Sequence, residues 1–425
     1  MDNSLKGGVK VGNYTLLLKP IGQGSYGTVF LAKDEKGNFY ASKRIKLDKL
    51  KKSKVKEKLI REIKLLYKLD NPHILKMNDL LKSKSHIYVF LEYCNGETLN
   101  SFVENYKKIY KELVPQNIVQ MFTKQIIEGL SYMSKKNCIH RDLKLENIMI
   151  TSNISNNEKN EIIKKIISNK DILNLVPEKQ SIFSFNSFKD IIPTPKYFEN
   201  KVNNLYDILK DYTIKIIDLG FAKEIEEDEK ITSFCGSPLE MPPEIWSLNL
   251  GEKKIYYTKK CDLWSLGCVL YNLAFDSFPF NGDSYEEIFQ NIQKGKYIIK
   301  KINGLSIEFV DLICCLIKVD PEDRYDYNIL INHPFIVKNY EDLKEFVFEN
   351  NSDHIVLNAN ESKKILDNII IEKENELTSE EYKNDDEKDK FIDNFFLKEC
   401  EIIEFNIDDI DEDWVLIDLN KFMKK

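Results

Sequence analysis

The sequence predicts an α+β protein in which a small strand-rich part with one helix is followed by a larger helical part. Short runs of β-branched and aromatic residues dominate roughly the first 95 residues. From Gly96 onward the apolar residues recur mostly at helical spacing. A length of 425 residues with 42% hydrophobic and 31% charged residues allows a packed core and excludes a wholly disordered or collagen-like chain.

Four strands and one amphipathic helix are expected in the strand-rich part. The strand candidates are residues 14–21, 28–33, 39–45 and 87–91. Val55, Leu59 and Ile63 begin an apolar stripe at helical spacing, which predicts a helix over residues 54–69. Asn71 and Pro72 are expected to end this helix.

Three stretches of the C-terminal part carry helical signals. An apolar stripe runs from Ile118 to Met133, with Pro115 near the start of the predicted helix. Residues 261–275 are apolar on most sides, which predicts a buried central helix. Residues 307–317 are expected to form another apolar helix.

Residues 151–211 break this pattern, because they are rich in Asn, Lys, Ile and Ser and follow no steady period. They lie between two short β-prone pieces, residues 148–150 and 213–217, which predicts a long insertion in a hairpin-like connection. The insertion is either a poorly ordered surface expansion or a docking element. The strongest binding groups of such an element are Phe183, Phe185, Phe188 and Tyr197.

The charge is uneven along the chain, and the net charge is −7. Residues 351–425 hold 22 acidic and 10 basic residues, which leaves a mildly basic body before an acidic tail. A protein that bound nucleic acid through bulk charge would be basic, so no nucleic-acid partner is expected.

The cysteines and the apolar runs predict a cytoplasmic protein. None of the eight cysteines forms a Cys-x-x-Cys pair, which indicates reduced and mostly buried thiols. Residues 1–10 lack the apolar core of a signal peptide. The longest apolar helical run is too short and too polar to span a bilayer, so no transmembrane segment is expected.

A Gly-x-Gly-x-x-Gly motif lies between the first two strand candidates. Glycines allow a backbone to approach phosphate groups closely, with its N–H groups facing them. The motif and its flanks are Ile21, Gly22, Gln23, Gly24, Ser25, Tyr26, Gly27, Thr28 and Val29. A dinucleotide-binding fold would need a helix directly after the glycines. The sequence continues instead as a strand, which disfavours that fold.

Two further patterns place charged groups near such a phosphate site. Lys43 lies in a β-prone run, and Glu62 lies on the predicted helix that follows, so that a Lys–Glu pair could orient the ammonium group. Residues 140–147 read His-Arg-Asp-Leu-Lys-Leu-Glu-Asn. In this loop the carboxylate can accept a hydroxyl proton, the lysine can neutralise a phosphoryl group and the amide oxygen can bind Mg²⁺.

With these motifs the sequence resembles eukaryotic serine/threonine protein kinases over roughly residues 14–335. Further motifs support the resemblance: Asp218-Leu219-Gly220, Pro242-Pro243-Glu244, residues 262–267 and Asp323-Arg324. The resemblance implies a bilobal kinase fold, with a small, mainly antiparallel β N-lobe holding one helix and a larger, mainly α C-lobe. It also implies ATP and Mg²⁺ as cofactors and proteins with Ser or Thr as substrates.

The resemblance also implies domain boundaries and a role for each site residue. The expected units are an N-terminal extension (1–13), a kinase domain (14–335; N-lobe 14–94, C-lobe 95–335, insertion about 151–211) and an acidic C-terminal tail (336–425). The catalytic residues are Asp142, Lys144, Lys43 and Glu62; the metal ligands are Asn147 and Asp218; and the ATP-binding residues are 21–29, Lys43, Leu91, Glu92 and Cys94.

Regulation is implied by the same comparison. In kinases of this pattern, an arginine such as Arg141 is available to a phosphate on the activation segment. The expected phosphorylation site is Ser233, with Thr232 second and Lys223 as an additional cation. The acidic tail is either a solvated segment packing loosely on the basic body or the site of a regulatory partner.

Residues 234–239 and the tail residues 413–417 resemble the autophagy-initiating kinase group. Calcium/calmodulin-type kinases are the alternative, although the acidic tail contains no basic amphipathic helix. A pseudokinase scaffold and a small-molecule kinase are the other readings that we considered. Glu240 departs from the family pattern, because many kinases carry an aromatic residue there.

Overall fold

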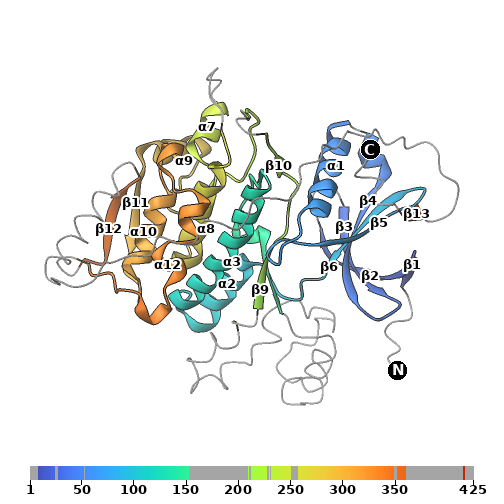
Figure 1. Cartoon of the computed structure of the whole chain (residues 1–425), viewed down its shortest axis with the longest axis horizontal. Coiled ribbons are helices and arrows are strands. Elements are labelled where there is room, and N and C mark those ends of the chain that lie inside the picture. Colours follow the sequence, from blue (N-terminus) through green and yellow to red (C-terminus); the bar gives the residue numbers. More distant parts are fainter. Residues whose placement is uncertain are drawn as a thin grey trace, which may run out of the picture.

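The computed structural model describes residues 8–23, 27–51, 53–152, 209, 212–226, 229, 231–249, 257–348, 352–359 and 415–416. These residues form a strand-rich N-lobe with one long helix and a mainly helical C-lobe, as Figure 1 shows. The predicted bilobal α+β fold is confirmed.

The N-lobe is a seven-stranded sheet in which every neighbouring pair is antiparallel. In spatial order its strands are β1 (Val9–Val11), β2 (Tyr14–Gln23), β3 (Gly27–Asp34), β4 (Phe39–Lys46), β6 (His86–Glu92), β5 (Met77–Lys82) and β13 (Val415–Leu416). A short 3-10 helix, η2 (Leu47–Lys51), leads from β4 into α1 (Ser53–Lys68). The predicted helix therefore forms, shifted by one residue at each end.

Alternation along the strands divides the apolar residues of the N-lobe between two clusters, because successive side chains of a strand point to opposite faces. Val89 of β6 joins the main core, in which Leu59 and Ile63 of α1 are also buried. Tyr88 and Phe90, its neighbours in the strand, join a second cluster. The stripe on α1 fixes the helix against the sheet, and this contact sets the position of Glu62 beside the strands.

The C-lobe is built around α8 (Cys261–Phe275), which is buried along its whole length, as predicted. The other helices are α2 (Leu99–Tyr110), α3 (Gln116–Lys135), α7 (Pro243–Asn249), α9 (Tyr285–Lys294), α10 (Ile307–Leu316), α11 (Tyr327–Leu330) and α12 (Pro334–Val337). Short 3-10 helices are η3 (Leu145–Asn147), η7 (Pro321–Asp323) and η8 (Tyr340–Asp342). No helix of the described residues is long and apolar enough to cross a membrane.

Short strand pairs at the lobe boundary carry the loops of the candidate site. β7 (Cys138–Ile139) pairs with β10 (Lys223–Glu224), and β8 (Ile148–Ser152) pairs with β9 (Tyr212–Ile216). The β8–β9 pair agrees with a hairpin-like connection. The insertion itself, with its four aromatic residues, lies outside the described residues except at positions 151, 152 and 209.

Residues 340–359 pack on the C-lobe rather than leaving it. β12 (His354–Asn358) pairs with β11 (Lys296–Lys300), and Phe346 N–H donates to the Leu305 carbonyl at 2.7 Å. Phe346 and Leu357 are buried in the main core. The domain boundary at residue 335 stays a prediction, and these contacts extend the packed C-lobe beyond it.

Candidate active site

Strand β4 and helix α1 bring Lys43 and Glu62 together. Lys43 Nζ lies 2.6 Å from Glu62 Oε1, and both side chains are largely buried. Lys43 is held between β3 and β6 by its pairing with Val29 and Val89. The other carboxylate oxygen, Glu62 Oε2, is buried without a hydrogen-bond partner among the described residues. The pair gives a cation a fixed place at the cleft face of the N-lobe sheet.

The catalytic loop is braced from the first turn of α8. Asp262 accepts hydrogen bonds from the backbone N–H groups of His140 at 2.7 Å and Arg141 at 2.8 Å. Arg141 has φ +67°, in the left-handed region that a side chain disfavours. Strained backbone of this kind persists where the surroundings hold it in place, and here Asp262 supplies the restraint.

Asp142, Lys144 and Asn147 meet on this loop. Lys144 Nζ lies 3.4 Å from Asp142 Oδ2, and both groups reach the hydroxyl of Ser237. That hydroxyl donates to Asp142 Oδ1 at 2.7 Å and accepts from Lys144 at 2.8 Å. Asn147 Nδ2 donates to the Asp142 carbonyl at 2.8 Å. A carboxylate that accepts a hydroxyl proton beside an ammonium group has the arrangement needed for general-base chemistry.

The predicted metal ligands have the donor chemistry that Mg²⁺ requires. The Asn147 amide nitrogen is committed to Asp142, so its carbonyl oxygen is the atom that a hard cation would meet. Asp218 follows β9 and accepts a hydrogen bond from Gly220 N–H through Oδ1 at 2.8 Å. This local turn fixes the carboxylate of the Asp-Leu-Gly segment. Oxygen donors from these two residues fit a magnesium ion.

The expected adenine-binding residues lie at the end of β6, where the chain passes between the lobes. Leu91 pairs with Ala41 of β4 and is buried. Glu92 forms an ion pair with Lys215 of β9 at 2.9 Å. Cys94 is buried, and this burial raises the pKa of its thiol to about 12, which keeps it protonated at neutral pH. Residues 24–26 of the glycine motif lie outside the described residues.

Arg141 links the catalytic loop to the segment after Asp218. Its Nη1 donates to the Ser233 hydroxyl at 2.8 Å and to the Tyr257 hydroxyl at 3.2 Å, and its Nε donates to the Phe221 carbonyl at 2.7 Å. Thus Ser233 meets the predicted cation. Thr232 is exposed next to it, and Lys223 pairs with Glu229 instead.

Tyr257 completes this cluster and was missed by sequence reasoning. Its hydroxyl donates to the Ser233 carbonyl at 2.9 Å, and burial raises the pKa of its phenol. A lone tyrosine after a polar loop gives no signal of such a contact. Only the fold brings it to Arg141.

Glu240 is buried close to the catalytic loop. Burial, reinforced by the nearby carboxylate of Glu146, raises the pKa of the Glu240 carboxyl to about 8, against a smaller opposite effect of Lys144. Its backbone carbonyl accepts a hydrogen bond from Ser265 of α8 at 2.8 Å. The carboxyl is therefore mostly neutral at pH 7, which explains how an acidic residue is tolerated there.

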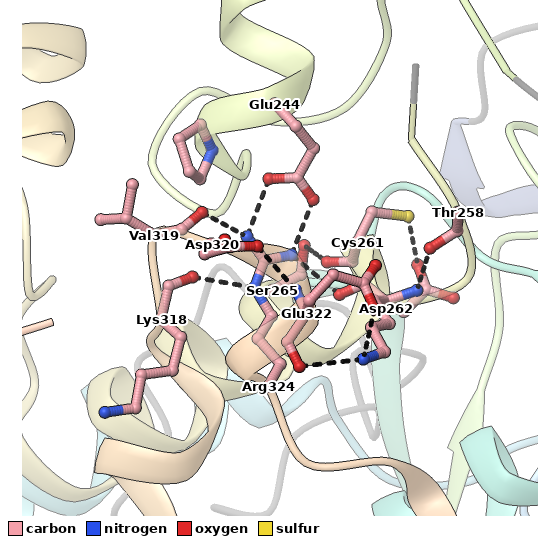
Figure 2. A network of polar contacts seen from close by, with 12 residues as sticks. Glu244, Thr258, Cys261, Asp262, Ser265, Lys318, Val319, Asp320, Glu322 and Arg324 are labelled. Carbon is pink, nitrogen blue, oxygen red and sulfur yellow. Dashed lines mark hydrogen bonds and ion pairs between the residues drawn. The ribbon is translucent and has the colours of Figure 1, made fainter. Parts of the chain in front are cut away.

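A buried ion pair supports the segment from below. Figure 2 shows Arg324 donating to both carboxylate oxygens of Glu244, with nitrogen–oxygen distances of 2.6 and 2.8 Å. Arg324 Nε donates to the Lys318 carbonyl at 2.9 Å, and Nη1 donates to the Lys260 carbonyl at 3.0 Å. Bidentate pairing and these carbonyls satisfy the guanidinium, so the charge can be buried.

The protein kinase domain family matches residues 16–167 and 200–336 of the chain. The chain is 29% identical over 329 residues to serine/threonine-protein kinase ATG1c of Arabidopsis thaliana, which covers 77% of this chain and 36% of the relative. It is 30% identical over 338 residues to serine/threonine-protein kinase atg1 of Neosartorya fischeri, with 75% and 32% covered.

A third relative has a different named role. The probable cell cycle serine/threonine-protein kinase CDC5 homolog of Encephalitozoon cuniculi is 28% identical over 324 residues, with 76% of this chain and 54% of the relative covered. The chain thus spans between about a third and about a half of the length of these relatives. The family match covers more than half of the chain, and it confirms the resemblance to serine/threonine protein kinases. The chain belongs to the protein kinase family.

Proposed function

We propose that this chain is an active serine/threonine protein kinase that transfers the γ-phosphoryl group of ATP to hydroxyl groups of protein substrates. The observation that carries the proposal is the contact of Asp142 with both Lys144 and a hydroxyl, that of Ser237. The Lys43–Glu62 pair supports it from the N-lobe. Protein kinases normally use ATP and Mg²⁺, which supports both as cofactors here.

In the proposed reaction the C-lobe residues act on the substrate hydroxyl and on the transferring group. Asp142 orients the hydroxyl and accepts its proton as the new O–P bond forms. Lys144 lies beside this carboxylate and offsets negative charge on the phosphoryl group. Asn147 and Asp218 would hold Mg²⁺, which when bound neutralises charge on the phosphates.

The proposed nucleotide site combines N-lobe and hinge groups. Lys43, oriented by Glu62, contacts the ATP phosphates, and residues 21–29 cover them. Leu91 flanks the adenine, while Glu92 and Cys94 offer backbone groups to its edge. The extended backbone of β2 and β3 on either side of the glycine motif supports this assignment.

The direct test is phosphorylation of a peptide library by the full chain with Mg²⁺ and labelled ATP. Phosphoserine and phosphothreonine should form, and substitution Asp142→Asn should abolish their formation. A wild-type chain that binds ATP and phosphorylates nothing would favour the pseudokinase scaffold. Label on a small molecule alone would favour the small-molecule kinase.

We also propose that phosphorylation of Ser233, or secondarily of Thr232, activates the enzyme. The contact of Arg141 with the Ser233 hydroxyl supports Ser233, because a phosphate there could form ~1–3 charge-assisted hydrogen bonds. Phosphatase-treated enzyme should lose turnover, and Ser233→Ala should resemble it more than Thr232→Ala does. If a double alanine variant matches fully phosphorylated wild type, the switch does not reside at these residues.

The two relatives named for ATG1 support a proposal of cytoplasmic autophagy-type signalling, with a regulatory partner at the acidic tail. The alternative is a calcium/calmodulin-type kinase. Turnover with and without Ca²⁺ and calmodulin separates the two, since only the alternative predicts stimulation.

A further inference from the structure

The outer edge of the N-lobe sheet is covered by a strand from the far end of the chain. β13 pairs with β5 antiparallel, with Val415 opposite Lys82 and Leu416 opposite Leu81. Figure 1 shows β13 beside β5, although more than 300 residues separate them in the sequence. Without β13, β5 would be the last strand of the sheet on this side, with one row of backbone N–H and C=O groups unpaired.

The burial of β5 is a second observation that this edge is covered. Lys82 and Leu81 are each only 3% exposed, although they lie at the end of the strand. Lysine is almost never fully buried on a protein surface. Its burial at an edge strand requires chain on that side of the sheet, and the backbone partner there is Val415.

The covered edge is continuous with the strands of the candidate active site. The row that begins at Val415 passes through Lys82, Ile87 and Ile45 to Gly27, the last glycine of the motif. Each step is an antiparallel partner in neighbouring strands. A strand added at the edge therefore completes a ladder that ends where the glycine motif returns into β3.

We propose that the outer edge of β5 is a strand-docking site and that its occupant is the chain's own C-terminal strand, bound in cis. Linker length favours this occupant, because a flexible linker of roughly 55 residues, the number between Ala359 and β13, has a root-mean-square span of roughly 40 Å. This span is comparable with the size of a kinase domain, so docking within one chain is favoured over docking between dilute chains. Three acidic residues precede Trp414 and complement the positive charge of Lys82 and Lys84 at the end of β5.

The docking site does not depend on phosphoryl transfer, so it is tested by hydrogen exchange on the full chain. The variant Val415→Pro with Leu416→Pro removes two backbone N–H donors and is incompatible with an inner pairing position. Amides of residues 77–82 should exchange on the order of tenfold faster or more than in wild type. The matched control, Val415→Ile with Leu416→Val, should retain wild-type exchange, and β11 serves as the reference for global folding. Unchanged exchange over residues 77–82 in a folded proline variant would overturn the proposal.

A peptide of residues 411–420 gives a second test that does not depend on the folding of the proline variant. Added in excess to wild type, it should speed exchange at residues 415–416 while residues 77–82 stay protected. It should also bind the proline variant more tightly than wild type, whose edge is occupied. No release of residues 415–416 by the peptide would overturn the proposal. A wild-type dimer that becomes monomeric in the proline variant, measured by light scattering, would show docking between copies and would overturn binding in cis.

Discussion

Removing Glu244 should destabilise the C-lobe strongly, because its partner is one of the most deeply buried charges in the described residues. The side chain of Arg324 is 0% exposed, and that of Glu244 is 8% exposed. In Glu244→Ala the guanidinium keeps its carbonyl acceptors but loses both carboxylate oxygens. Breaking a buried pair by removing one partner costs about 3–5 kcal/mol. A whole domain is stable by only about 5–15 kcal/mol, so this change removes a large fraction of the stability.

The assay is urea unfolding followed by tryptophan fluorescence, since Trp264 stacks below the Arg324 guanidinium at 5.3 Å. The matched control is Glu322→Ala, which breaks an exposed pair with Lys260 at 3.3 Å, where Glu322 is 78% exposed. An exposed pair contributes only about 0–1 kcal/mol. If Glu244→Ala and Glu322→Ala shift the midpoint equally, the buried pair does not stabilise the fold as argued.

Three further predictions concern the cleft, the pH dependence and the tail. Lys43→Met should lower turnover by roughly 10²-fold or more without unfolding the domain, and Glu62→Gln should share this loss in direction; a harmless Glu62→Gln would refute the pair. Because the folded pKa of Glu240 is raised from 4.5 to about 8, its contribution to stability is fully present below pH 4.5 and is lost as the pH rises through about 8. Glu240→Gln should therefore flatten the fall of the melting temperature with pH across that window, which a parallel slope would contradict. Deleting residues 341–425 should destabilise the C-lobe, whereas deleting 360–425 should leave its melting transition near that of wild type; equal stability of the two products would show that residues 341–359 are not needed.

The main elements of the fold could be predicted because their apolar periodicity is local. The helix that carries Glu62 and the buried helix α8 form within one residue of the predicted bounds. Strand β5 was not predicted, because Asn78 and Asp79 disfavour strands in isolation. Its strand conformation depends on pairing with β6, which propensity alone does not reveal.

The contacts of the candidate site follow two rules. Motif residues that are close in sequence, such as Asp142 and Asn147, could be expected to meet because one loop carries both. Contacts across long separations, such as Tyr257 with Arg141 or β13 with β5, need the tertiary fold. The notebook of roles implied by family resemblance for Lys43, Asp142 and Asp218 stays a set of predictions that variants must test.

The central claim is that Asp142 carries out phosphoryl transfer rather than nucleotide binding. The most direct measurement is the rate of peptide phosphorylation by Asp142→Asn beside its affinity for ATP, with Asp353→Asn as an exposed control outside the cleft. Turnover should fall by ~10²–10⁴-fold, while the dissociation constant for ATP stays near that of wild type. Near-wild-type turnover in Asp142→Asn would contradict the account.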